Sequence, residues 1–76
     1  MKEGTKMSEK QSFPEILAKE IERNRELLEM YKELPGGVGI FGAIWINRDI
    51  NHAIEALASG DVVEMIKAYE SMKDNN

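Results

Sequence analysis

The amino-acid sequence predicts an all-α protein with three helices, at about residues 13–34, 39–59 and 62–73. Large apolar residues recur along these segments at steps of three and four, which is helical periodicity. Two of the segments open with the Ser/Asp-x-x-Glu pattern of a capping box, at Ser12 and at Asp61. A chain of 76 residues makes at most one domain, so we expect a single helical domain over residues 12–76. We expect dimerisation to complete the helical bundle.

The first helix begins at Ser12, with Pro14 in the first turn and Glu15 completing the capping box. It should end near Leu34, because the residue before a proline is biased away from the helical region. The apolar stripe of this helix comprises Phe13, Leu17, Ile21, Leu28 and Tyr31.

Asn24 falls on the same stripe, between Ile21 and Leu28. A polar residue there can set the register of a helix pair. The other interpretation is that Asn24 sits at the edge of the stripe and meets water. We favour the second interpretation.

The segment after the first helix is a hinge made of Pro35, Gly36, Gly37 and Gly39. Glycines allow such a joint to bend in many ways. The first helix can therefore pack on its own chain or on a neighbouring copy. In the second case, two copies would exchange their first helices through the hinge.

The second helix is apolar almost all round in its first two turns, which carry Phe41, Ile44 and Trp45. Such a helix is normally buried, and one partner helix in so short a chain cannot cover both faces. We therefore expect a homodimer that buries these three residues. Base rates favour the core for Phe41 and Trp45, and a contact surface is the alternative. In the dimer, the first helix can also pair along Leu17, Ile21, Leu28 and Tyr31.

The third helix opens at Asp61, with Glu64 three residues on, and follows Gly60, which suits the end of the second helix. Its apolar residues are Val62, Met65, Ile66, Tyr69 and Met72. Residues 1–11 hold a single large apolar side chain beyond the initial Met1, namely Met7, so we expect a disordered tail there.

Composition argues against several classes of function. There is no cysteine, so disulfides and thiolate metal sites are excluded. The net charge is −4 with no long basic run, which is unlike a nucleic-acid binder. No apolar run approaches the roughly 20 residues of a membrane span, and the first residues lack the apolar core of a signal peptide. We expect a cytoplasmic protein that binds neither nucleic acid nor membrane.

Two motifs indicate possible ligand binding, one for a dinucleotide and one for a metal ion. Residues 37–42 match the G-x-G-x-x-G dinucleotide fingerprint, but a helix precedes them where a strand is needed. Asp49, His52 and Glu55 are spaced by three on one helix, although their side chains drift around its axis. We expect no cofactor, no metal and no catalytic residue from either motif.

Residues 39–43 read G-x-F-G-A, and residues 60–69 read G-D-V-V-x-M-I-x-A-Y. In these two segments the chain resembles a group of small uncharacterised proteins of bacteria and their phages, over roughly residues 30–73. No activity is attached to that group, so no catalytic residue is carried over. The resemblance implies a prophage or accessory origin and an interaction role.

The sequence thus predicts a non-enzymatic protein–protein interaction module, such as a phage accessory factor, that uses an apolar helix face. The partner would be a second copy or another protein. The alternative is a small-ligand, anion or metal-binding protein that uses the helix start at Gly37–Gly42 together with His52.

Overall fold

A computed structural model describes residues 12–76, and this part of the chain is all-α. It contains α2 (Phe13–Lys32), a short 3-10 turn η1 (Pro35–Gly37), α3 (Ile40–Ser59) and α4 (Val62–Lys73). The predicted fold class is confirmed, with the first helix ending two residues earlier than expected, at Lys32. The tail predicted for residues 1–11 lies outside the described residues.

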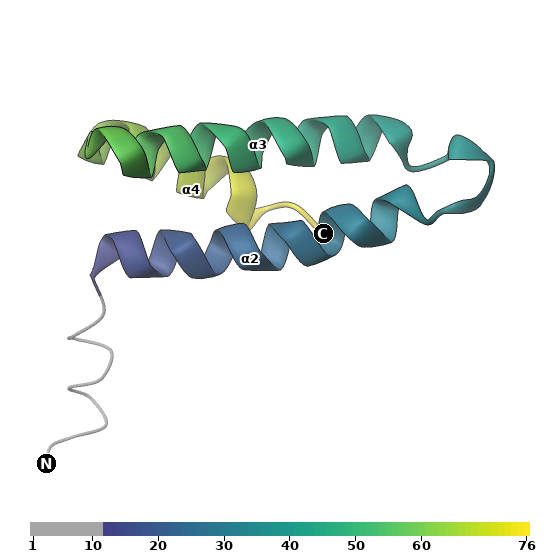
Figure 1. The fold of residues 1–76 in the computed structure, drawn as a ribbon, viewed down its shortest axis with the longest axis horizontal. Helices are drawn as coiled ribbons and strands as arrows, with labels where there is room; N and C mark the ends of the chain where they lie inside the picture. The colour runs from purple at the N-terminus through teal and green to yellow at the C-terminus, as the bar shows by residue number, and fades with distance from the viewer. Residues whose placement is uncertain (1–11) are drawn as a thin grey trace, which may run out of the picture.

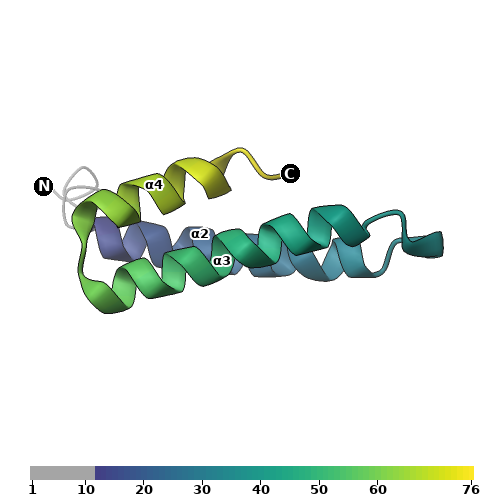
Figure 2. The same ribbon diagram turned by 90° about the horizontal axis from the view of Figure 1, so that it is seen from above.

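The helices form a hairpin with a third helix on one side of it (Figure 1). α2 and α3 run antiparallel over their whole length, and α4 turns back from the end of α3 to lie across both (Figure 2). α4 has 12 residues against 20 in each of the other two helices. It therefore covers one face of the hairpin and leaves the half next to η1 bare.

The start of α2 is a complete capping box, as predicted. Ser12 Oγ accepts from the Glu15 amide at 3.3 Å, and the Glu15 carboxylate accepts from the Ser12 amide at 3.0 Å. At α4 only half of the predicted box forms. Asp61 Oδ1 accepts from the Val63 and Glu64 amides, but the Asp61 amide donates to Ser59 Oγ because the Glu64 carboxylate is engaged elsewhere.

The hinge glycines form a tight turn in this structure. Gly36 and Gly37 adopt φ of 68° and 72°, the left-handed region that L side chains rarely enter. Gly39 and Gly42 serve close approach, because a Cβ at either position would collide with Tyr31. At Gly39 the obstacle is the Tyr31 backbone carbonyl, and at Gly42 it is the Tyr31 ring.

The core lies between the three helices, and the first helix packs on its own chain. Leu17, Ile21 and Leu28 are buried there, and Tyr31 is half-buried against the core. The other helices contribute small and flexible side chains, namely Ala43, Ile46, Ile50, Ala53, Ala56, Met65, Ala68 and Met72. The preference for a water-exposed Asn24 is wrong: this side chain is 0% exposed.

Candidate interaction surface

The first half of α3 carries a large exposed apolar surface. Phe41 is 75% exposed, Trp45 59% and Ile44 50%. We call these three residues the aromatic surface. The prediction that Phe41 and Trp45 belong to the core is wrong for the single chain, because both side chains are exposed.

The exposure follows from the lengths of the helices. The first turns of α3 are apolar on every side, but α2 covers only the side that presents Ala43 and Ile46. α4 stops before it reaches this level (Figure 2). Isolated exposed apolar residues are ordinary on protein surfaces, whereas a contiguous group of them marks a contact site.

The aromatic surface is held in place and bordered by a cation. The Arg48 guanidinium lies over the Trp45 ring, 4.9 Å from its centroid, which is the geometry of a cation–π contact. No charged residue occurs in the sequence from Leu34 to Asn47. The segment of α3 that bears the surface is therefore uncharged, and the Arg48 guanidinium lies at its edge.

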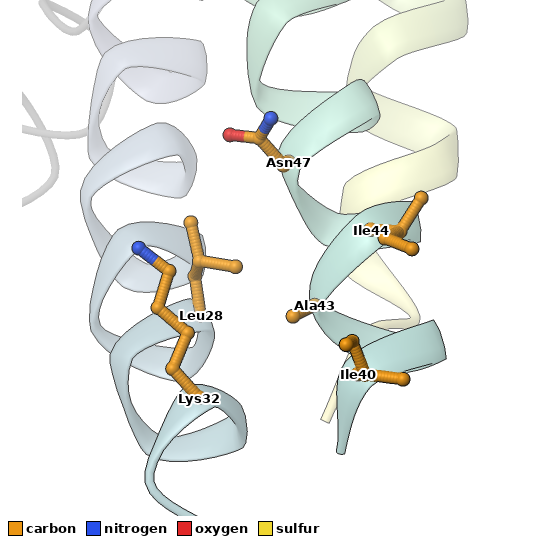
Figure 3. A pocket seen from close by; sticks show the side chains of 6 residues that line it. All are labelled: Leu28, Lys32, Ile40, Ala43, Ile44 and Asn47. Carbon is orange, nitrogen blue, oxygen red and sulfur yellow. The ribbon is translucent and has the colours of Figure 1, made fainter. Parts of the chain in front are cut away.

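A second apolar feature is a shallow groove between α2 and α3, with a volume of about 310 Å³. Figure 3 shows it from the side opposite α4, which lies behind the hairpin. The groove is lined by Leu28, Lys32, Ile40, Ala43, Ile44 and Asn47. Ile44 thus belongs to both the groove and the aromatic surface.

A network of polar side chains that the sequence did not predict holds the end of the chain on the hairpin. Asn75 Nδ2 donates to Asn24 Oδ1 at 2.9 Å and to Asp49 Oδ2 at 3.0 Å. Asn24 Nδ2 donates to the Glu20 carbonyl at 2.9 Å. The only signal in the sequence was a polar residue on an apolar stripe, and it does not reveal partners more than 40 residues away.

Arg23 completes the attachment of α4. Its guanidinium donates to the Met72 and Asn75 carbonyls, both at 2.9 Å, and forms an ion pair of 2.7 Å with Glu20. The hydrogen bond to Glu20 raises the pKa of Arg23 further above its ordinary value. Arg23 thereby supplies donors to carbonyls at the C-terminus of α4, where cations are favourable.

The residues of the predicted metal alternative are drawn into separate contacts. Asp49 accepts from Asn75, and His52 Nε2 lies 2.9 Å from Glu64 Oε1 on α4. Glu55 is exposed. Across residues 12–76 no three carboxylate or imidazole side chains are gathered as a metal site would require.

Glu64 is the best-connected acid of the α3–α4 contact. Its carboxylate meets His52 and, at 3.4 Å, Lys67 Nζ. These contacts hold the pKa of Glu64 below its ordinary value, and the hydrogen bond to His52 is the largest single cause. The arrangement joins α3 to α4.

The G-x-G-x-x-G segment lies in η1 and the first turn of α3. It follows α2, and no strand occurs in the part of the chain that the structure describes. Gly42 and His52 lie ten residues apart on α3, about 15 Å along its axis. The two halves of the predicted ligand site therefore do not converge.

Comparison with known proteins yields no relative. No protein-family model matches the chain, and neither curated proteins nor solved structures show significant similarity to it. Within the described residues, none of the helices has the length and apolar character needed to span a membrane.

Proposed function

We propose that the protein is a small non-enzymatic interaction module, and that the aromatic surface is its contact site for another protein. The single observation that carries this proposal is the exposure of Phe41, Ile44 and Trp45 together on one helix. Aromatic residues dominate the binding energy of protein interfaces, and a polar rim around them excludes water. The bound partner would present an apolar pocket with acidic groups facing Arg48.

Self-association is the second part of the proposal, and the chain is proposed to work as a homodimer in the cytoplasm. The resemblance to small bacterial and phage proteins supports an accessory role in a phage or prophage. No observation favours the ligand-binding alternative, which stays a prediction from the sequence. A thermal-shift screen with nucleotides, phosphate and divalent metals tests it, since a ligand that binds the folded state raises the melting temperature.

The test compares Trp45→Ala with Val63→Ala, because Val63 on α4 is 60% exposed and thus a matched apolar control. Proteins captured from a host extract by the wild type are purified, and their binding to each variant is measured by calorimetry. We expect Trp45→Ala to weaken binding at least tenfold, as for a hot-spot residue, and Val63→Ala to leave it unchanged. The proposal fails if Trp45→Ala leaves both partner binding and self-association intact.

A further inference from the structure

The face of the hairpin opposite α4 carries a regular stripe along α3, of which Figure 3 shows the first three members, Ile40, Ile44 and Asn47. Its members are separated by steps of four, three, four, three and four residues, which is the spacing of a coiled-coil seam. All six are exposed, with Ile44 at 50% and Ile54 at 41%. The stripe comprises Ile40, Ile44, Asn47, Asn51, Ile54 and Ala58.

The stripe is nearly the same when it is read in either direction. Two asparagines lie at its centre, an isoleucine lies on each side of them, and an aliphatic residue stands at each end. A contact between identical copies around a two-fold axis must be self-complementary in this way. Antiparallel pairing of two α3 helices would place Ile44 against Ile54 and Asn47 against Asn51 of the second copy.

α2 adds no apolar stripe of its own to this face, because Ile21 and Leu28 are buried in the core of their own chain. Arg25, which lies between them, is exposed. Its neighbour Asn24 lies at the level of Asp49, the centre of the α3 stripe, because the single amide of Asn75 bridges Asn24 and Asp49. A two-fold axis through the centre of the α3 stripe therefore lies at the level of Arg25.

We infer that two copies of the chain pack through these bare hairpin faces, with each α3 antiparallel to the other and the axis at the level of Arg25 and Asp49. The inference rests on the self-association in the proposed function and names its geometry. Trp45 lies outside the stripe, so the dimer keeps it free for another partner. The sequence alone predicts a different geometry, in which Phe41 and Trp45 themselves lie in the dimer interface.

The size of the face fits a stable dimer. Two helices of 20 residues lying side by side present a footprint of about 30 by 20 Å, or roughly 600 Å² before surface relief is counted. A standard interface buries about 800 Å² on each partner. Arg25 would meet its counterpart near the axis, and Glu22, whose carboxylate lies 3.8 Å from Nε of Arg25, supplies a neighbouring negative charge.

Cysteine cross-linking tests the register cleanly, because the chain has no native cysteine. Asn47→Cys and Asn51→Cys replace exposed polar residues, so both variants should fold. One of them carries a size tag, and disulfide formation is followed on non-reducing gels. We expect the mixture to cross-link about tenfold faster than either variant alone, through the high effective concentration within a complex. Arg25→Cys should cross-link with itself, and Lys67→Cys on α4 should not.

Two results would overturn the inference. Faster cross-linking of Asn47→Cys with itself would show parallel pairing, and equal rates in all mixtures of a chain that is dimeric in solution would show a different interface. In the second case the proposed self-association stands. Adding Trp45→Ala to both cysteine variants should leave the cross-linking rate unchanged. Its loss would place the dimer contact on the aromatic surface instead.

Discussion

Asn75 donates its side-chain amide to the fully buried Asn24, joining the end of the chain to the middle of α2. The same amide reaches Asp49 on α3. Among residues 12–76, no buried side-chain nitrogen or oxygen lacks a hydrogen-bond partner. Leaving a buried amide without hydrogen-bond partners costs free energy. The contact between Asn75 and Asn24 therefore fixes where α4 and the residues after it pack along the hairpin.

Asn24→Ala removes the centre of this network and should destabilise the fold by about 1–3 kcal/mol, the usual cost of leaving buried polar partners unsatisfied. Urea unfolding followed by circular dichroism measures the change. Ser71→Ala is the control, because Ser71 is exposed on α4 and should shift stability by no more than about 0.5 kcal/mol. Equal stabilities of the two variants would contradict the role given to Asn24.

Periodicity and capping patterns were enough to predict the three helices, since these signals depend on residues only three or four apart. The partners of Asn24 could not be predicted this way. Asn75 follows it by 51 residues, and the contact exists only because α4 folds back over the hairpin. The sequence shows that a polar residue lies on an apolar stripe, but the rest of the fold decides whether it meets water.

Gly42→Ala should destabilise the protein, although replacing glycine in a helix normally stabilises it by up to about 1 kcal/mol. The new methyl group would collide with the Tyr31 ring, and overpacking costs about 1–3 kcal/mol. Combined with Tyr31→Ala, the same substitution should become favourable. Thermal unfolding of the two singles and the double variant forms the required cycle.

Gly39→Ala provides the contrasting case for that cycle. The obstacle at Gly39 is the backbone carbonyl of Tyr31, which side-chain truncation does not remove. Tyr31→Ala should therefore fail to rescue Gly39→Ala. We expect Tyr31→Ala to rescue Gly42→Ala alone. Rescue of both glycine variants, or of neither, would contradict a contact of Gly42 with the Tyr31 ring and of Gly39 with the Tyr31 backbone.

The pKa of Glu64 should rise toward its ordinary value of 4.5 in His52→Ala, because the hydrogen bond to His52 is the largest single cause of its lowering. Lys67→Ala should raise the pKa of Glu64 as well, because Lys67 acts on it through a hydrogen bond and through its charge. A carboxyl group with a lowered folded pKa stabilises the fold above its unfolded pKa, and that stabilisation is lost as pH falls through the folded pKa. The α3–α4 contact should thus weaken below about pH 4.5.

Carbon-detected NMR titration of the Glu64 carboxyl measures this directly. Val63→Ala serves as the control, because it removes an exposed side chain of α4 and leaves both partners of Glu64 in place. An unchanged Glu64 pKa in His52→Ala would show that the contact with His52 does not persist in solution.

The candidate site was only partly predictable. The apolar excess at the start of α3 singled out Phe41, Ile44 and Trp45 from the sequence alone. Whether they belong to the core depends on where α4 ends relative to α3, and periodicity does not report that distance. The stripe from Ile40 to Ala58 became visible only once α4 was known to occupy the opposite face of the hairpin.

The most direct measurement is the molar mass in solution, by size-exclusion chromatography with light scattering over a dilution series. The chain has a mass of 8.6 kDa, and we expect twice this value at high concentration with a return toward the monomer on dilution. Glu substitutions at Ile44 and Ile54 should abolish the dimer, while Val63→Glu should not. A mass of 8.6 kDa at every concentration would contradict self-association.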